Sequence, residues 1–283
     1  MGFSRSDPMV AADWLVENLS SPDLLTVDAS WYLGGSKNAG QARCDYEAAH
    51  IPSAVFFDID DVADHASALP HMLPDAETFA SKAGGLGIAD TSRLVIYDKN
   101  SYAASARAWW MFRAMGFENV RVLDGGWNAW IEAGGEASDA PTAVIEQPFN
   151  AQKRENLVKS LEQMASIVAQ GSHIIFDARP SGRFSGESPE PRADLKSGHM
   201  PGARNVPAGQ VRAPDGKLKS AEDLDSLFGD TSGPIVTSCG SGVTAAVLAL
   251  ALARLGRDDV AVYDGSWTEW GAGDHPIETV RGV

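Results

Sequence analysis

A cysteine in a glycine-rich loop is the residue of this sequence best placed to do chemistry. Cys239 follows the apolar run 234–238 and opens the segment CGSGVT at 239–244, after which an apolar helical pattern begins. The two glycines let the backbone curl tightly, so that successive N–H groups can point at one sulfur atom. The helix N-terminus adds the positive end of its dipole. Both effects favour the thiolate, so we expect Cys239 to be a nucleophile whose loop can also hold a persulfide anion.

The alternative for Cys239 is a small apolar side chain at the end of a strand. Its Gly-x-Gly loop and its strand–loop–helix setting favour the nucleophile. Cys44, the other cysteine, lies in the polar segment QARCDYEAAH, shows neither feature, and is interpreted as structural or incidental. Two cysteines are also too few for a disulfide framework or a cysteine-rich zinc site, so we expect no metal.

Strands and helices alternate along the chain on either side of this loop. Short apolar runs rich in β-branched residues predict buried parallel strands at LLTV, RLVIY, VRVL, HIIF, PIVTS and VAVY. Helical patterns at 103–115 and 243–255 are each followed by glycine. The alternation predicts an α/β fold with helices on both faces of a parallel sheet. Ligands bind beyond the carboxyl ends of such strands, which is where Cys239 lies.

The sequence contains an internal repeat. LLTVDASW, with Asp28, matches HIIFDARP, with Asp177, at an offset of 149 positions (177 minus 28). Further on, LVIYDKNSYAASARAWW matches PIVTSCGSGVTAAVLAL, which aligns Asp98 with Cys239 at an offset of 141 (239 minus 98). Such self-similarity indicates a duplicated structural unit.

The repeat divides the chain into two predicted domains. Gly, Ser, Ala, Pro and Gln accumulate near 134–156, and the periodicity fades there. We therefore expect a first domain at 1–140, a linker at 141–157 and a second domain at 158–283, each domain being a parallel sheet flanked by helices. A chain of 283 residues is long enough for two hydrophobic cores.

The formal net charge of −15 argues against some classes of partner. So acidic a chain repels nucleic acid and anionic lipid, and no run of Lys and Arg offsets this. The longest apolar run, 245–253, is too short to cross a bilayer, and the first residues lack a signal-peptide pattern. We expect neither a nucleic-acid nor a membrane partner, and a cytoplasmic location that keeps the thiol reduced.

The segment CGSGVTA at 239–245 resembles the active-site signature of the 3-mercaptopyruvate sulfurtransferases, within the rhodanese superfamily. The repeated segments HIPSAVFFDID, GHMPGARNVP, DGGWNAW and YDGSWTEW extend this resemblance along the chain. It implies two homologous rhodanese-like domains, of which only the second carries the cysteine, with Asp98 at the equivalent position of an inactive first domain. It also implies sulfur transfer through a Cys239 persulfide, without a metal or organic cofactor.

The resemblance implies further residues that bind the substrate. The segment GRFSGESPEPR at 182–192 resembles the stretch that binds the substrate carboxylate in this family, and Arg183 and Arg192 match its two arginines. Arginine can bind a carboxylate through two parallel hydrogen bonds. The alternative is a surface ion pair of arginine with Glu187 or Glu190. The loop positions implied to contact the substrate are Gly240, Gly242, Val243 and Thr244.

A proton relay is also implied by the resemblance. In the family, a serine two residues after the cysteine is proposed to act with an aspartate and a histidine from the first domain. The matching positions are Ser241, Asp60 in FFDID and His71 in PHMLP. A histidine between a carboxylate and a hydroxyl can carry the proton that a departing pyruvate enolate needs. The alternative for His71 is a structural contact between the domains.

The composition of the loop distinguishes among possible substrates. Cysteine phosphatases of related fold carry an arginine six residues after the cysteine, where this chain has Ala245. Thiosulfate sulfurtransferases place Arg and Lys within the loop, whereas this chain has Gly240 and Ser241. A monocarboxylate donor, 3-mercaptopyruvate, therefore fits better than the thiosulfate dianion.

The acceptor and the alternatives to this activity are less defined by the sequence. We expect a small thiol, a thioredoxin-like dithiol or cyanide as acceptor, and a monomeric protein. Two alternatives stay open, namely a thiosulfate sulfurtransferase and a persulfide carrier supplied by a partner desulfurase.

Overall fold

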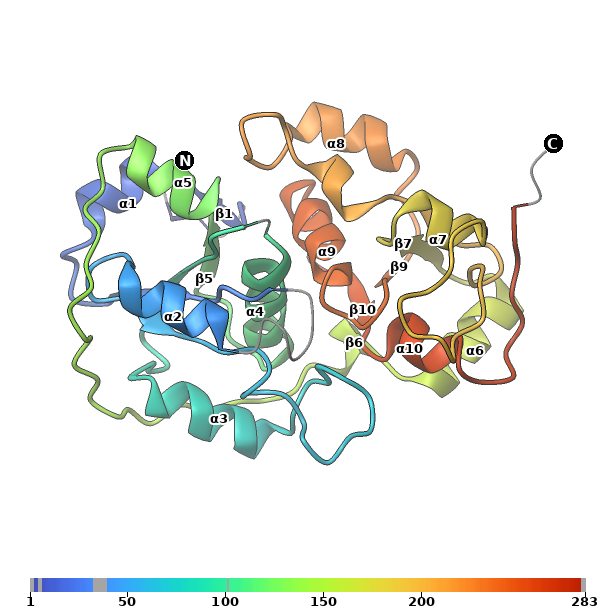
Figure 1. The fold of residues 1–283 in the computed structure, drawn as a ribbon, viewed down its shortest axis with the longest axis horizontal. Helices are drawn as coiled ribbons and strands as arrows, with labels where there is room; N and C mark the ends of the chain where they lie inside the picture. Colours follow the sequence, from blue (N-terminus) through green and yellow to red (C-terminus); the bar gives the residue numbers. More distant parts are fainter. Residues whose placement is uncertain (1–2, 5–6, 33–39, 101, 281–283) are drawn as a thin grey trace. The chain divides into compact units, whose positions relative to one another are not determined.

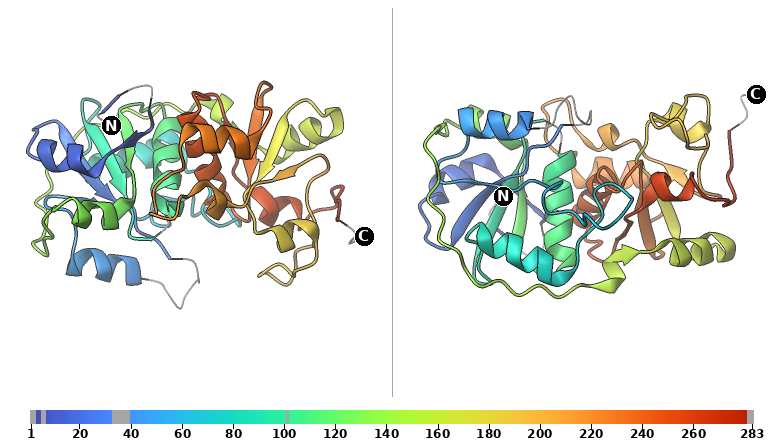
Figure 2. Two further views of the ribbon diagram at one scale, coloured as in Figure 1. Left: turned by 90° about the horizontal axis from the view of Figure 1, so that it is seen from above. Right: turned by 60° about the horizontal axis from the view of Figure 1, so that its bottom comes forward.

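Two compact units make up the chain in a computed structural model, which describes residues 3–4, 7–32, 40–100 and 102–280. The first unit comprises Met1–Asp64, Leu73–Arg154 and Pro214–Lys217. The second comprises His65–Met72, Glu155–Ala213 and Leu218–Val283. Each unit holds one twisted parallel sheet with helices on both faces (Figures 1 and 2).

The sheet of the first unit has five strands in the order β1-β5-β4-β2-β3, and every pair is parallel. Its central strands alternate their side chains between two apolar layers, as a sheet buried on both faces requires. The strands are β1 (Met9–Val10), β2 (Leu24–Asp28), β3 (Val55–Phe56), β4 (Arg93–Tyr97) and β5 (Val120–Leu123).

Helices cover both faces of this sheet. On one face, side chains of α1, α2 and α5 pack with Val95 and Tyr97 of β4 in a single core cluster. On the other, an aromatic cluster joins Phe79 of α3 and Phe112 of α4, whose ring centroids lie 5.1 Å apart. The helices are α1 (Ala12–Asn18), α2 (Gln41–Ala48), α3 (Ala76–Gly85), α4 (Ala103–Ala114) and α5 (Gly126–Glu132).

The second unit repeats this plan with the strand order β6-β10-β9-β7-β8, again all parallel. Its strands are β6 (Val158–Lys159), β7 (Ile174–Asp177), β8 (Arg204–Asn205), β9 (Ile235–Ser238) and β10 (Ala261–Tyr263). Its helices are α6 (Leu161–Gln170), α7 (Ser181–Ser185), α8 (Ala221–Phe228), α9 (Ala245–Arg254) and α10 (Ser266–Trp270), with 3₁₀ turns η2 (Glu155–Leu157) and η3 (Ala208–Val211). The predicted α/β class, with two homologous parallel sheets flanked by helices, is confirmed.

The helix patterns are confirmed with one shift. The pattern at 103–115 forms α4, and Gly116 follows it with φ +87°. The pattern at 243–255 forms α9 two residues late, at Ala245, because Val243 and Thr244 lie in the turn that closes the cysteine loop. None of the described helices is both long and apolar enough to cross a membrane.

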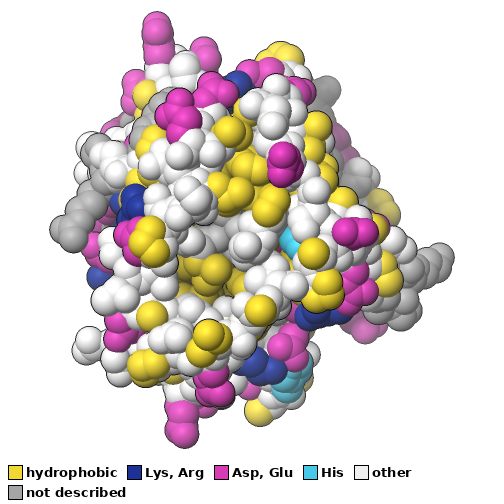
Figure 3. Space-filling view, turned by 90° about the vertical axis from the view of Figure 1, so that its left-hand side faces the viewer, with side chains coloured by type: hydrophobic (Ala, Val, Ile, Leu, Met, Phe, Trp, Pro, Cys, Tyr) yellow, Lys and Arg dark blue, Asp and Glu magenta, His cyan; other side chains and the backbone are white. Residues whose placement is uncertain are grey.

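The surface agrees with the acidic composition. Seen from the side in Figure 3, acidic side chains are scattered over the face, Lys and Arg are few, and apolar side chains gather around a central hollow.

A buried aspartate ends a central strand in each unit, but only one of the two is paired with a cation. Asp177 of β7 is fully buried and binds the guanidinium of Arg179 through both carboxylate oxygens. Asp28 of β2 is equally buried, and Ser30 takes the place of that arginine. Among the described atoms, Asp28 Oδ2 has no hydrogen-bond partner. Burial raises the pKa of Asp28, which hydrogen bonding and the charge of Lys99 offset only in part.

The two aspartates should therefore respond oppositely to the same substitution. Asp28→Asn should raise the free energy of unfolding at pH 8, because it removes a charge that burial disfavours. Because its pKa is raised in the folded state, ionised Asp28 lowers the free energy of unfolding. This loss is absent below the unfolded-state pKa and grows as the pH rises. The gain in stability from Asp28→Asn should therefore shrink toward pH 4. Asp177→Asn should lose about 3–5 kcal/mol, because Arg179 is left without its carboxylate. Urea unfolding at both pH values measures this, and equal losses in the two variants would contradict it.

Candidate active site

Cys239 begins the loop that joins β9 to α9 in the second unit. Only 2% of the residue is exposed, and it is a free cysteine. Gly242 has φ +80°, a left-handed conformation that glycine adopts without strain. Val243 is buried, and Ser241 and Thr244 are half-buried on the same turn. The sequence thus correctly placed a cysteine and a tight glycine turn at the carboxyl end of a central strand.

The start of α10 fixes the backbone on both sides of the cysteine. Ser266 Oγ accepts the N–H of Cys239 at 3.1 Å and donates to the carbonyl of Tyr263 at 2.7 Å. Trp267 N donates to the carbonyl of Cys239 at 3.0 Å. Thr268 donates to the carbonyl of Gly240 from its N–H at 2.8 Å and from its hydroxyl at 2.6 Å. Three consecutive residues of α10 therefore hold the backbone at Cys239 and Gly240.

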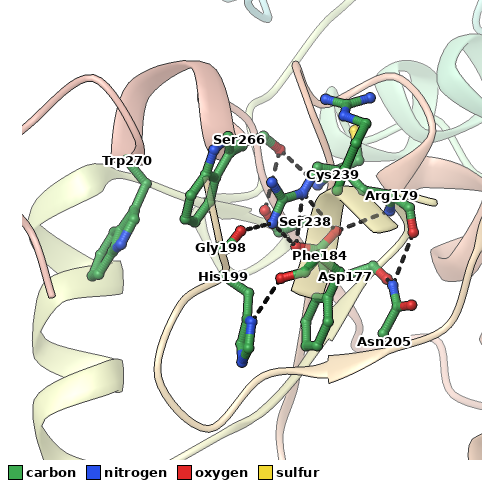
Figure 4. A network of polar contacts seen from close by, with 12 residues as sticks. Asp177, Arg179, Phe184, Gly198, His199, Asn205, Ser238, Cys239, Ser266 and Trp270 are labelled. Atoms are coloured by element: carbon green, nitrogen blue, oxygen red, sulfur yellow. Dashed lines mark hydrogen bonds and ion pairs between the residues drawn. The ribbon is translucent and has the colours of Figure 1, made fainter. Parts of the chain in front are cut away.

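A buried chain of charges leads from the end of β7 to this loop. Arg179 lies between Asp177 and Glu190, donating from Nη2 to Asp177 at 2.6 Å and from Nη1 to Glu190 at 2.8 Å. A third bond runs from Arg179 Nη2 to the carbonyl of Gly198, as the close view in Figure 4 shows. The guanidinium also lies 4.1 Å from the centre of the Trp267 ring. Every polar end of this buried arginine is thus satisfied, which a buried charge requires.

Arg183, one of the two predicted substrate arginines, is the last residue in this series of charged side chains. Its Nε donates to Glu190 Oε2 at 3.1 Å, and its Nη2 bonds the same oxygen. The same Nη2 lies 3.2 Å from the position that a Cβ on Gly240 would occupy. The structure therefore brings Arg183 against the loop that carries Cys239. The ion-pair alternative for Arg183 is observed with Glu190, but the carboxylate is buried rather than on the surface.

The second predicted arginine reaches the loop through a hydroxyl. Arg192 is exposed, and its Nη1 donates to Thr268 Oγ1 at 3.0 Å. Because that hydroxyl donates to the carbonyl of Gly240, Arg192 is one residue removed from the cysteine loop. Two guanidinium groups therefore lie near one face of an otherwise uncharged loop.

Comparison with known proteins gives the family. A family model described as a rhodanese-like domain matches the chain twice, at residues 11–133 and 160–272. The chain belongs to the rhodanese family. The 3-mercaptopyruvate sulfurtransferase of Escherichia coli (strain K12) is 41% identical over 277 residues, which cover 96% of this chain and 98% of that protein. A mitochondrial thiosulfate/3-mercaptopyruvate sulfurtransferase of Arabidopsis thaliana is 41% identical over 305 residues, covering 98% of this chain and 80% of that one.

A solved structure supports the same assignment. The crystal structure of SseA from Escherichia coli, described as having the rhodanese fold of 3-mercaptopyruvate sulfotransferases, matches with a TM-score of 0.81 and 39% identity. The match covers 92% of this chain and 99% of that chain.

The first rhodanese unit shows what such a loop does with an anion. Asp98 directly follows β4, at the position that Cys239 takes after β9, and is only 4% exposed. Its carboxylate accepts the N–H groups of Tyr102 at 3.2 Å and of Ser105 at 3.0 Å, and the Ser105 hydroxyl at 2.9 Å. The N–H of Asn100 adds a fourth contact at 3.3 Å. In the first unit, the loop therefore directs several hydrogen-bond donors at a side-chain carboxylate of its own.

The predicted relay residues are divided between the two units. Ser241 and the segment His65–Met72, which includes His71, belong to the second unit, whereas Asp60 belongs to the first. His71 adopts a left-handed backbone conformation with φ +63°. Asp60 Oδ2 accepts the indole N–H of Trp31 at 2.8 Å. The Asp60–His71–Ser241 relay remains a prediction.

Sequence reasoning missed Arg179 and Ser266 at this site, and it named Glu190 only as a possible surface ion-pair partner. Arg179 and Glu190 form the buried charge chain, and Ser266 holds the amide of Cys239. The repeat contained the available signal, because Arg179 aligns with Ser30 and Ser266 with Gly126, so that the two copies differ in type at both positions.

We expect Ser266 to stabilise the cysteine loop through its hydroxyl, although its own left-handed backbone conformation is strained. Its φ of +49° is left-handed, while Gly126 takes φ +58° at the same place in the first unit. Ser266→Ala should be more destabilising than Ser266→Gly by about 1 kcal/mol, because both lose the acceptor for Cys239 N–H but only glycine relieves the strain. Urea unfolding of the two variants measures the difference. A glycine variant less stable than the alanine variant would show that φ strain at Ser266 is unimportant.

Proposed function

We propose that this enzyme transfers the sulfur of 3-mercaptopyruvate to a thiol acceptor through a persulfide on Cys239. The observation that carries this proposal is the Arg183 guanidinium lying against Gly240, beside a cysteine loop that has no charged side chain of its own. A donor with one carboxylate can bind Arg183 and Arg192 while its sulfur faces Cys239. The names of the two relatives, each about 41% identical, support the same activity.

Sulfur uptake begins with the thiolate. Cys239 Sγ attacks the sulfur of 3-mercaptopyruvate, an S–S bond forms, and the carbon–sulfur bond breaks with its electron pair leaving on carbon. The products are the Cys239 persulfide and the enolate of pyruvate. Amides of the curled loop stabilise the anionic sulfur, in the way that the Asp98 loop donates to a carboxylate.

The enolate must take up one proton to become pyruvate. We assign this transfer to Ser241 and His71, with Asp60 as the carboxylate that orients the histidine. Gly242, Val243 and Thr244 complete the wall of the donor site. Release of pyruvate then leaves the persulfide for the acceptor.

The second half-reaction returns the enzyme to its starting state. An acceptor thiolate or cyanide attacks the outer sulfur of the persulfide, and the electrons of the S–S bond return to Cys239 as a thiolate. A small thiol or a thioredoxin-like dithiol is the acceptor we propose. We also propose a monomer working in the reducing cytoplasm, where Cys239 stays free.

Thiosulfate is the second candidate donor. The name of the Arabidopsis relative includes both donors, which keeps thiosulfate transfer open for this chain. A persulfide carrier supplied by a partner desulfurase would contain the same cysteine loop but release no pyruvate.

The first test compares donors on the wild type and Cys239→Ser. Wild type should release pyruvate from 3-mercaptopyruvate and use thiosulfate poorly, and the substitution should abolish both activities, because a serine hydroxyl is a far weaker nucleophile than a thiolate. Lactate-dehydrogenase-coupled pyruvate release and thiocyanate formation measure the two reactions. Better turnover of thiosulfate would establish the second candidate, and no turnover of either donor would favour the carrier.

The relay makes a separate prediction about one donor. Ser241→Ala and His71→Ala should each slow pyruvate release by about 10²-fold or more, because proton transfer to the enolate is impaired. Both should leave thiosulfate:cyanide transfer nearly unchanged, since thiosulfate releases no carbanion. Ser241→Thr keeps the hydroxyl and serves as the control. An equal loss with both donors would instead indicate a general role in shaping the loop.

A further inference from the structure

Glu190 is shared by two arginines in the interior of the second unit. Its side chain is only 1% exposed. Oε1 accepts Nη1 of Arg179 at 2.8 Å, and Oε2 accepts Nε of Arg183 at 3.1 Å. A buried carboxylate between two guanidinium groups is fully compensated, and it ties the exposed member of the chain to the buried one.

The charges of the four linked side chains cancel. Asp177 and Glu190 contribute two negative charges, and Arg179 and Arg183 contribute two positive charges, so the sum is zero. Arg192 adds one positive charge, and it makes no ion pair with the residues that the structure describes. The loop at 239–244 adds none. These five side chains, Asp177, Glu190, Arg179, Arg183 and Arg192, therefore sum to a net charge of about +1.

Glu190 also sets how Arg183 faces the loop. It engages Nε and Nη2 of the guanidinium, so the remaining N–H groups are the ones available to a ligand. Only 21% of the Arg183 side chain is exposed, and its Nη2 lies against Gly240. The guanidinium is thus held both by a carboxylate behind it and by the loop beside it.

We infer that Glu190 makes the site selective for a singly charged sulfur donor over a dianion. Because Glu190 cancels the charge of Arg183, one positive charge remains beside the loop. That charge balances one carboxylate but only half the charge of a dianion. Glu190 acts through Arg183 rather than on the donor itself, so it is a positioning and specificity-determining residue. This inference rests on the proposed function, in which a carboxylate donor binds beside Cys239.

The experiment measures kcat/KM for 3-mercaptopyruvate and for thiosulfate in wild type and Glu190→Gln. Cyanide is the acceptor throughout, and thiocyanate is the common product. Removing one negative charge beside Arg183 should shift the thiosulfate-to-mercaptopyruvate ratio of kcat/KM toward thiosulfate by about tenfold, because the dianion gains more than the monoanion. A structural defect alone would lower both values together, so an unchanged ratio overturns the inference.

Two further variants control for charge and for folding. Glu187→Gln removes the same charge from an exposed site on the same loop, and the ratio should stay within about twofold of wild type because solvent screens that position. Glu190→Asp keeps the charge but shortens the side chain, so both donors should react more slowly at an unchanged ratio. If Glu190→Gln does not fold, Arg192→Gln tests the same charge balance, because it removes one positive charge. Its ratio should move away from thiosulfate, and an unchanged ratio or a shift toward thiosulfate overturns the inference.

The wild-type measurements separate this inference from the proposed function. If wild type turns over neither donor, or thiosulfate better than 3-mercaptopyruvate, the proposed function fails whatever the variants do. If wild type prefers 3-mercaptopyruvate and Glu190→Gln keeps that preference, only the role of Glu190 fails.

Discussion

The second unit is organised around one buried arginine. Arg179 is only 1% exposed, and its guanidinium joins the carboxylate that ends β7, the carbonyl of Gly198 and Glu190. Burying a charge costs several kcal/mol unless its hydrogen bonds are all made, and here each polar nitrogen has an acceptor. Because Glu190 in turn holds Arg183, the end of a core strand is connected to the group that contacts the cysteine loop. The position of Arg183, the side chain proposed to bind the substrate, is thereby set from inside the fold.

The duplicated units show two uses of one backbone plan. Both sheets have equivalent strand orders, and both place a critical residue directly after the central strand, Asp98 in one and Cys239 in the other. In the first unit, the loop donors bind a carboxylate of the chain itself. In the second, the side chain of Cys239 stands at that position, where the proposed mechanism forms a thiolate and then a persulfide. The same backbone plan therefore holds a carboxylate in one unit and the proposed nucleophile in the other.

A second contrast concerns the carboxylates below these loops. Asp177 has Arg179 as its partner, whereas Asp28 has Ser30, and burial raises the pKa of Asp28. Among the residues that the structure describes, Asp28 has no guanidinium partner. Ser30 therefore stands where Arg179 connects Asp177 to Glu190 in the second unit.

The sequence by itself determined the fold class, the repeat and the cysteine loop, while Arg183 and Arg192 followed from the resemblance to the family. Periodicity and glycine placement depend on neighbours along the chain, so the strands at 93–97 and 235–238 and the tight turn at Gly242 could be read from order alone. Tertiary structure decided which charge pairs with which. Glu187 and Glu190 looked alike as partners for Arg183, and only folding buries Glu190 between two arginines and leaves Glu187 exposed. The Ser266 hydroxyl likewise meets the amide of Cys239 across 27 residues of sequence, because β9 and β10 pair in parallel and bring their carboxyl ends together. Contacts of that kind depend on sheet register and burial, which spacing along the chain does not encode.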